Sequence, residues 1–362
     1  MYHATHAANH CRQLQSFAHL RARDRVTFNH VVADFKHHSG LRAASMITRI
    51  QLHNFKAHAD LDIQEIPHLA VLVGRNNTGK SSVLQAAAIS KHGWHQDAPL
   101  PIGAPNEVPH KKGEEVRVLL SFRGAPSPLL ISVNKGGGYG VTWQGPQPAE
   151  SPANDIHYIS AQRTAYRQFG YNPFTTDVGM TGEQTWNILH QLKADSDPRF
   201  DKVVEWLQKM DLGISMVTTP TVQPGQGAIL PVSYGDRVNV IMQGSGTWTL
   251  LPIITQGLLA EAGHTILIEE PESHLHRAAI NDLWLFLADC AKRDVQVICT
   301  THSLDFLAAM SERIERGEVP KESAIYHLKR DESGKTSASL LDPAVFRNVA
   351  KVIKDDLAAK YP

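Results

Sequence analysis

The segment that constrains this chain most is Gly74 to Ser81, which reads GRNNTGKS. It matches in full the pattern G-x-x-x-x-G-K-[ST], a glycine-rich loop whose backbone cradles phosphate groups. The apolar run before it, residues 68–73, is typical of a buried strand. The alanine-rich run after it, residues 82–89, is typical of a helix. Strand, loop and helix in this order predict a binding site for a nucleoside triphosphate. We call residues 74–81 the phosphate loop.

Each residue type in the phosphate loop has a physical task. Backbone N–H groups of the loop and of the first helical turn point at the β- and γ-phosphates, and the helix dipole favours their negative charge. Lys80 would place a positive charge on those phosphates, and the Ser81 hydroxyl would ligate Mg²⁺. Asn77 stands where many such loops have glycine. This exchange is mild, because asparagine is among the few non-glycine residues that tolerate a positive φ.

The composition is that of an ordinary globular protein. The chain has 362 residues, enough for one large α/β domain or two smaller ones, with 42% hydrophobic and 20% charged residues. Lys+Arg and Asp+Glu both number 36. Tight non-specific binding of nucleic acid by the whole surface is therefore not expected, whereas a local basic groove is compatible with these numbers.

Cysteine usage and hydropathy indicate a cytoplasmic protein. Cys11, Cys290 and Cys299 form no C-x-x-C pair, which fits a reducing compartment. No run approaches the roughly 18 apolar residues of a membrane-spanning helix. The amino terminus lacks the apolar core of a secretory signal. We therefore expect a cytoplasmic location and no membrane partner.

Residues 1–45 differ from the rest of the chain. Seven of the 20 histidines lie in the first 40 residues, and six Lys/Arg stand against two Asp in 1–45. Three interpretations are open: a metal-binding tract, a basic arm that touches nucleic acid, and a peripheral, partly helical extension. Irregular histidine spacing without Cys or carboxylate partners favours the extension. The first well-patterned segment begins at Met46.

The middle of the chain alternates between strand-like and helix-like segments. Strands are expected at 47–52 and 61–63, joined by a polar connection at 53–60, and again at 115–122, 129–133, 139–143 and 157–160. Residues 91–113 are rich in Pro, Gly and His and predict a loop. Helical periodicity covers 182–212, and residues 213–243 are β-like with Pro and Gly between the strands. The pattern predicts an antiparallel β-lobe followed by a helical lobe.

A second group of candidate residues follows the run TILIEEPE, residues 265–272. A strand that is apolar on both faces is typical of a central parallel sheet, and acids at its carboxyl end lie where open α/β sheets bind ligands. We predict that Glu269 ligates Mg²⁺, directly or through water. We predict that Glu270 is the general base that orients and deprotonates the attacking water.

The next strand ends in a histidine. Residues 278–292 predict a helix with one apolar stripe, and residues 295–300 predict a buried strand that leads to His302. A histidine at this strand end can reach the γ-phosphate or the attacking water. Strand, acid pair, helix and strand predict a right-handed βαβ unit beside the phosphate loop.

Small residues also precede a helical run at 248–254. The segment QGSGT, residues 243–247, would leave free N–H groups at the positive end of that helix. Ser245 and Gly246 therefore predict a second anion site, with a plain loop as the alternative.

The order of these motifs resembles that of an ABC-type ATPase head of the OLD/RecF/SMC kind, often described as an AAA-family ATPase. The resemblance extends from Met46 to the region of Asp342. It is carried by the segments ITRIQLHNFKAHADLDI, VGRNNTGKSSVL, YISAQR, VGMTGEQTWNIL, MQGSGTWTLL, LIEEPESHLH and TTHS. It implies an α/β fold of the P-loop NTPase type, with a mostly parallel core sheet, an antiparallel β-lobe and a helical lobe. The head would span 46–362, in parts 46–160, 161–243 and 244–362.

The resemblance also implies residue roles in binding ATP and Mg²⁺. The Walker A loop, which binds ATP, comprises Gly74, Arg75, Asn76, Asn77, Thr78, Gly79, Lys80, Ser81 and Ser82. Gln162 occupies a Q-loop position, in reach of nucleotide and Mg²⁺. Glu269 and Glu270 are the Walker B acid and the catalytic base, residues 273–276 are the D-loop region, and His302 is the switch histidine. Lys80, Glu270 and His302 would carry the catalysis of ATP hydrolysis.

The resemblance further implies an assembly. In such proteins two heads enclose two ATP molecules head to tail, and the signature element of one head clamps the γ-phosphate bound to the other. Here Ser245 and Gly246 form that element, so a homodimer or higher homo-oligomer is expected. The sequence departs from the usual pattern at two places. Gln243 and Gly244 replace a leucine-serine opening, and Arg277 follows LH where many relatives have proline.

Two larger features of such proteins are not found. No long coiled coil is inserted, and the 60 residues after His302 are too few for the TOPRIM nuclease domain of OLD nucleases. We therefore expect an ATPase that acts as sensor or regulator for a separate effector, such as a nuclease, in an anti-phage defence-type system. A RecF-like DNA-repair ATPase is the alternative, with Arg163, Arg167, Lys111, Lys112 and the basic arm as DNA contacts. A transporter nucleotide-binding subunit is a minor alternative.

Overall fold

The computed structural model describes residues 45–92, 107–164, 166–172, 175–233, 235–331 and 335–341. These residues belong to one compact unit, Ala43–Pro362. The three interpretations of residues 1–45 concern residues outside this described part, apart from Ser45. The predicted loop at 91–113 is described only in part: the preceding helix continues to His92, and residues 107–113 are irregular.

A six-stranded sheet forms the centre of the unit, in the order β17-β16-β3-β15-β14-β7. Its strands are β3 (Leu69–Gly74), β7 (Ile156–Ile159), β14 (Thr265–Glu269), β15 (Gln296–Thr301), β16 (Ala324–Arg330) and β17 (Thr336–Leu341). All neighbours pair in parallel except β16 and β17. Strands β3, β7, β14 and β15 are buried along their whole length, as a sheet covered on both faces requires. The predicted mostly parallel core sheet is therefore present.

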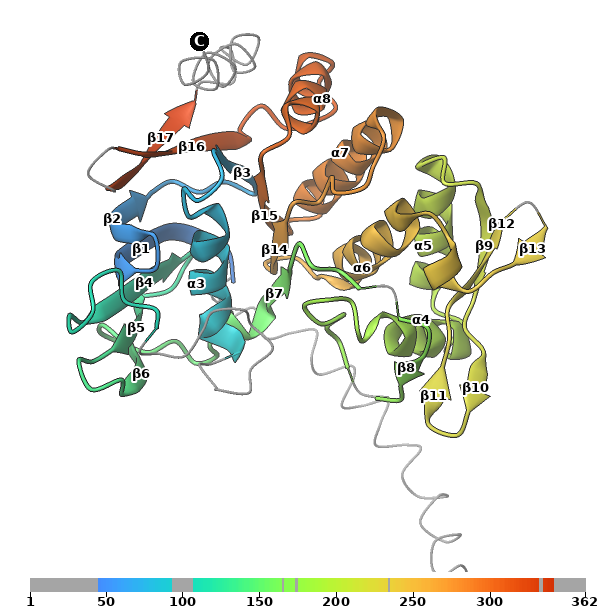
Figure 1. The fold of residues 1–362 in the computed structure, drawn as a ribbon, viewed down its shortest axis with the longest axis horizontal. Coiled ribbons are helices and arrows are strands. Elements are labelled where there is room, and N and C mark those ends of the chain that lie inside the picture. The colour runs from blue at the N-terminus through green and yellow to red at the C-terminus, as the bar shows by residue number, and fades with distance from the viewer. Residues whose placement is uncertain are drawn as a thin grey trace, which may run out of the picture. The chain divides into compact units, whose positions relative to one another are not determined.

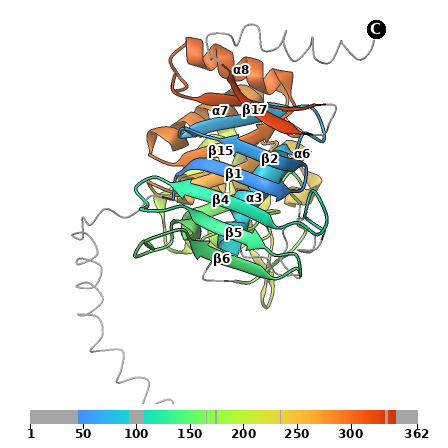
Figure 2. The same ribbon diagram turned by 90° about the vertical axis from the view of Figure 1, so that its left-hand side faces the viewer.

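A five-stranded antiparallel sheet forms the β-lobe, in the order β2-β1-β4-β5-β6 (Figure 2). Its strands are β1 (Ile47–Phe55), β2 (His58–Ile63), β4 (Val116–Phe122), β5 (Leu129–Val133) and β6 (Tyr139–Trp143). The expected polar connection at 53–60 is wrong in extent, because the pairing of β1 with β2 continues to Phe55 and His58. Positive φ angles at Asn54 and Lys56 allow this tight turn.

Helix α3 (Lys80–His92) lies between the two sheets, as Figure 1 shows. Its residues Val83, Leu84 and 86–89 are fully buried, because both sides of the helix meet apolar sheet faces. The small alanine side chains let both sheets approach the helix closely. The opposite face of the parallel sheet is covered by α6 (Ser245–Leu259), α7 (Arg277–Lys292) and α8 (Leu304–Glu315).

The helical lobe contains two helices and two small sheets. Its helices are α4 (Thr185–Ala194) and α5 (Pro198–Lys209), and its strands are β8 (Phe169–Gly170), β9 (Ile214–Thr218), β10 (Thr221–Gln223), β11 (Gln226–Gly227), β12 (Leu230–Ser233) and β13 (Asp236–Arg237). Short 3₁₀ turns occupy η1 (Pro152–Asp155) and η2 (Val240–Met242). The predicted helices at 182–212 and β-like character of 213–243 are both confirmed.

Candidate functional site

The phosphate loop connects the end of β3 to the first residue of α3. Asn77 has φ 64°, so it takes the left-handed conformation that asparagine tolerates. Gly79 has φ 88°, and a Cβ atom there would collide with the buried ring of His58. His58 Nε2 lies 3.0 Å from the Gly79 carbonyl oxygen, and this hydrogen bond connects β2 to the phosphate loop. The amide groups of Lys80 and Ser81 lie at the amino end of α3, where intrahelical acceptors are missing.

Lys80 is buried within the loop. Its Nζ donates to the carbonyl oxygens of Gly74 and Arg75 at 2.8 and 2.9 Å. Burial lowers the pKa of Lys80, whereas the charges of Glu270 and Glu272 oppose that shift. The ammonium group is therefore electrostatically coupled to the acids at the end of β14. Ser81 and Ser82 are half-buried in the first turn of α3, and Asn76 and Asn77 are exposed.

Glu269 is the last residue of β14 and is buried. Its Oε1 accepts from Tyr158 Oη at 2.7 Å and from Gln85 Nε2 at 3.3 Å. Burial, together with the charge of Glu269, raises the pKa of Tyr158 above its usual value, so the phenol remains a donor. Lys56 Nζ in turn donates to Gln85 Oε1 at 2.8 Å, and burial lowers the pKa of Lys56 to about 8. Lys56, Gln85 and Tyr158 therefore form a polar layer around Glu269.

Glu270 follows the strand and points toward His302. Glu270 Oε1 lies 3.0 Å from His302 Nδ1, and Glu270 Oε2 accepts from Ser273 Oγ at 3.4 Å. About one third of the Glu270 side chain is exposed, so solvent can reach it. The predicted base and the predicted switch histidine thus lie together at the carboxyl edge of the parallel sheet.

Glu272 is a third acid at this edge. Its Oε1 accepts a short hydrogen bond from Thr301 Oγ1, and its Oε2 is buried without a partner among the described residues. Burial raises the pKa of Glu272 to about 7. A cavity of about 450 Å³ is lined by Glu270, Glu272 and His302, together with Ala161, Ser273, His274 and Ser303. Glu272 belongs to the acidic run EEPE, but its spacing in that run did not predict a function for it.

The segment after β7 lies against the acids. Ala161 N donates to Glu269 Oε2 at 3.4 Å, which places the next residue, Gln162, at the same strand end. The Gln162 side chain is exposed, and its backbone N–H donates to Ser160 Oγ at 3.0 Å. Its assignment to nucleotide and Mg²⁺ stays a prediction.

The structure contradicts the predicted role of Arg163. It was a candidate DNA contact, but only 4% of it is exposed and its guanidinium group donates to carbonyl oxygens of Ser160, Glu269 and Glu270. A side chain so engaged cannot reach a phosphate backbone. Arg167, Lys111 and Lys112 are exposed. Nothing in sequence spacing predicts that an arginine more than 100 residues away would bind the acid pair.

Ser245 is the first residue of α6, with Gly244 as the preceding cap. Gly246 is buried beneath the D-loop region, because a Cβ atom there would lie 3.2 Å from Leu275 Cδ2 and 3.5 Å from the His274 carbonyl oxygen. The ring centroids of Trp248 and His274 are 5.7 Å apart. The predicted signature element and D-loop region therefore form one packed surface.

Two negative findings concern metals and membranes. Within the described ranges, no group of three or more His, Cys, Asp or Glu residues is placed to hold a metal ion. A protein-only Mg²⁺ cage is thus not found in that part of the chain, and the carboxylate and hydroxyl at the site suit an ion that shares its ligands with phosphates. In the same part of the chain no helix is long and apolar enough to cross a membrane.

Two family models match the chain. One, described as "AAA domain, putative AbiEii toxin, Type IV TA system", matches residues 194–309. The other, described as "AAA ATPase domain", matches residues 46–91. The first match includes Ser245, the acid pair and His302, and the second includes the whole phosphate loop. No curated protein sequence matches the chain significantly.

The fold is similar to that of two solved SMC head structures. One is the crystal structure of an SMC head bound to the C-terminal winged-helix domain of ScpA, with a TM-score of 0.59 at 14% identity, covering 82% of this chain and 98% of that one. The other is an SMC head with an extended coiled coil bound to the C-terminal domain of ScpA, derived from Pyrococcus furiosus. Its TM-score is 0.58 at 13% identity, and the match covers 85% of this chain and 99% of that one.

At these identities the likeness concerns the fold alone. The chain therefore has an α/β fold of the P-loop NTPase type, similar to that of SMC head structures. Two of its segments, residues 46–91 and 194–309, are similar to AAA-family ATPase domains.

Proposed function

We propose that this protein binds ATP with Mg²⁺ on the phosphate loop and hydrolyses it. The observation that carries this proposal is the meeting of Glu270 and His302 at 3.0 Å, at the strand ends beside a loop that holds a buried lysine. The residues fit the ligand. The loop amides and Lys80 would hold the phosphates, and Ser81 and Glu269 would share the metal ion, which supplies charge neutralisation when bound.

The chain's own residues would then perform the proton transfer. Glu270 is about one-third exposed and lines a cavity of about 450 Å³, where a water molecule has room beside its carboxylate. The carboxylate would take the proton of that water, and His302 would hold the carboxylate in place through its ring N–H. Lys80 would release the Gly74 and Arg75 carbonyl groups and turn to the phosphates, because a doubly negative partner outcompetes two neutral carbonyl groups.

We further propose that a second copy completes the site. Ser245 and Gly246 lie at the positive end of α6, a 15-residue helix, and their N–H groups suit the γ-phosphate bound to another protomer. The packing of Gly246 beneath His274 and Leu275 supports this, because it would present signature element and D-loop region to the partner as one surface. ATP would then join two copies head to tail.

The biological role we propose is control of a separate effector, such as a nuclease, in a prokaryotic anti-phage defence-type system. The match to a domain described as a putative AbiEii toxin of a type IV toxin–antitoxin system supports that context. In this proposal the effector is a separate chain, which senses whether the head dimer is formed.

The experiment compares the wild-type protein with Glu270→Gln. Phosphate release measures hydrolysis, light scattering after gel filtration measures oligomeric state with and without Mg–ATP, and mass spectrometry identifies what co-purifies with the variant. We expect hydrolysis by the wild type only and an ATP-dependent dimer of the variant with a stoichiometric second chain. Absence of hydrolysis by the wild type would overturn the ATPase proposal. A dimer with no bound effector would overturn only the regulatory role.

A further inference from the structure

Arg163 is a buried cation at the end of β7, beside the predicted catalytic acids. Strand β7 pairs in parallel with β14, with Ile159 opposite Ile268, so the segments that follow the two strands lie side by side. The Arg163 side chain crosses this gap. Only 4% of the residue is exposed.

The guanidinium group makes three short hydrogen bonds, all to backbone carbonyl oxygens. Nη1 donates to Ser160 at 2.9 Å and to Glu269 at 2.8 Å, and Nη2 donates to Glu270 at 2.7 Å. Charge-assisted bonds of this length are stronger than neutral ones. The fork of the guanidinium thus grips the two consecutive carbonyl groups on either side of the Glu270 Cα atom.

Glu270 needs such a grip because its backbone is strained. Its φ is 44°, in the left-handed region that non-glycine residues rarely take, at a cost of roughly 1–3 kcal/mol. Its N–H donates to the Thr300 carbonyl oxygen at 3.0 Å, so one side is held by β15. Arg163 holds the other side. This conformation turns the Glu270 carboxylate away from the strand direction and toward His302.

The charge of Arg163 serves the same site. Burial lowers the pKa of Arg163 to about 10, and the acids Glu272, Glu270 and Glu269 oppose that shift. Among the described residues, Nη1 and Nη2 donate to carbonyl oxygens and not to these carboxylates, and Nε is buried without a hydrogen-bond partner. The carboxylates therefore remain available to other partners while a positive charge lies among them.

We propose that Arg163 is a positioning residue that holds Glu270 in its left-handed conformation and so aims the catalytic carboxylate. This inference rests on the proposed role of Glu270 as the base. Lysine cannot replace arginine here, because Arg163 donates three hydrogen bonds from two nitrogen atoms held in one plane, and a single ammonium nitrogen cannot reproduce that arrangement. Arg163 should affect the rate of the chemical step and not the affinity for ATP, since its hydrogen bonds within the described chain go to protein carbonyl groups.

The test uses Arg163→Lys and Arg163→Met in the full chain, with Arg237→Lys as matched control. Arg237 is exposed in β13 of the helical lobe, outside the candidate site. We expect both Arg163 variants to lose about 10²-fold in kcat, the usual effect of a misplacement of roughly 1 Å, while KM for ATP changes less than about threefold. The control retains wild-type kcat. A parallel rise in KM with unchanged kcat would overturn the inference.

A double-mutant cycle separates positioning from general damage. In a Glu270→Gln background, single-turnover hydrolysis of labelled ATP should fall no further when Arg163→Lys is added, because the aimed carboxylate is already missing. A further loss of about 10²-fold would show that Arg163 acts elsewhere and would overturn the inference.

If Arg163→Met fails to fold, Arg163→Lys carries the test with its thermal midpoint as folding control. Should the wild-type enzyme show no hydrolysis, the proposed function fails first and the two failures are distinguished.

Discussion

His302 Nδ1 lies 3.0 Å from Glu270 Oε1, across the ends of two neighbouring parallel strands. Each residue directly follows its strand, since β14 ends at Glu269 and β15 ends at Thr301. The pairing of Glu269 with Thr300 sets the distance between them. An acid and a histidine that are 32 residues apart in sequence therefore meet because parallel strands end at the same edge of a sheet.

This contact predicts how His302 contributes to the reaction. His302→Ala should lower kcat by about 10–10²-fold with little change in nucleotide affinity, because the Glu270 carboxylate loses the ring that orients it. Glu270→Gln should lose about 10²–10⁴-fold and still bind ATP. Steady-state phosphate release and fluorescent-nucleotide titration measure the two quantities. Normal hydrolysis by Glu270→Gln would transfer the base assignment to Glu269 or Glu272.

Lys80 predicts a different phenotype, a loss of binding. Lys80→Ala should weaken ATP affinity on the order of 10²-fold, because a charge-assisted contact to phosphate contributes about 1.5–3 kcal/mol. Ser90→Ala at the other end of α3 is a matched control, since Ser90 Oγ donates to the Ala87 carbonyl oxygen of the same helix, away from the phosphate loop. Calorimetric titration of ATP measures both variants. Wild-type affinity of Lys80→Ala would contradict the assignment of the phosphate loop.

The sequence predicted those parts of the site that depend on local pattern. Asn77, Glu270 and His302 each follow a strand or lie in a loop whose geometry the neighbouring residues determine, and strand order at one edge brings the latter two together. The partners of the acids were not predictable in this way. Tyr158 reaches Glu269, and Arg163 reaches its carbonyl group, only because β7 pairs with β14, and no periodicity encodes which strands become neighbours.

Glu272 predicts a pH dependence of stability. Burial raises its pKa from 4.5 to about 7, so the folded state holds a proton that the unfolded state releases. The resulting stabilisation is complete below pH 4.5 and is lost as the pH rises to about 7, a change of about 3 kcal/mol at 1.36 kcal/mol per pKa unit. Glu272→Gln should lack this component. Denaturant unfolding from pH 5 to 8 measures it, with the exposed Glu322→Gln as control. Parallel pH curves for wild type and Glu272→Gln would contradict the prediction.

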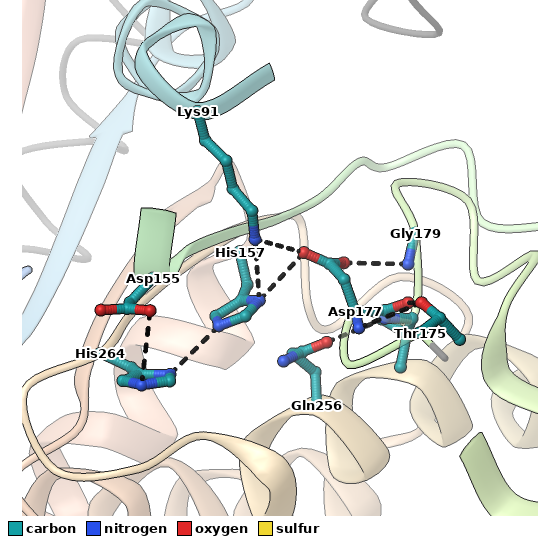
Figure 3. A network of polar contacts seen from close by, with 9 residues as sticks. Lys91, Asp155, His157, Thr175, Asp177, Gly179, Gln256 and His264 are labelled. Atoms are coloured by element: carbon teal, nitrogen blue, oxygen red, sulfur yellow. Dashed lines mark hydrogen bonds and ion pairs between the residues drawn. The ribbon is translucent and has the colours of Figure 1, made fainter. Parts of the chain in front are cut away.

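Asp177 predicts a pH dependence of stability with the opposite sign. This residue lies at the opposite end of the sheet from Glu272. Figure 3 shows its carboxylate between Lys91, at the end of α3, and His157, in β7. Asp177 Oδ2 lies 2.8 Å from Lys91 Nζ and 3.0 Å from His157 Nδ1, and Gly179 N donates to Oδ1 at 3.0 Å. Burial raises the pKa of Asp177, but the hydrogen bond from His157 and the charge of Lys91 outweigh it, so the pKa lies well below its usual value.

A lowered carboxyl pKa stabilises the folded state fully above the unfolded value of 3.8, and this stabilisation is lost progressively as the pH falls from 3.8 through the lower pKa of the folded state. Asp177→Asn should therefore cost about 3 kcal/mol at pH 7, because it leaves Lys91 half-buried without its anion, and roughly 1 kcal/mol less at pH 3, where part of the stabilisation is lost. The exposed Asp236→Asn should cost little at either pH. Urea unfolding at the two pH values measures the difference. An equal cost of Asp177→Asn at pH 3 and pH 7 would show that the carboxylate contributes packing and not charge to this junction of α3, β7 and the helical lobe.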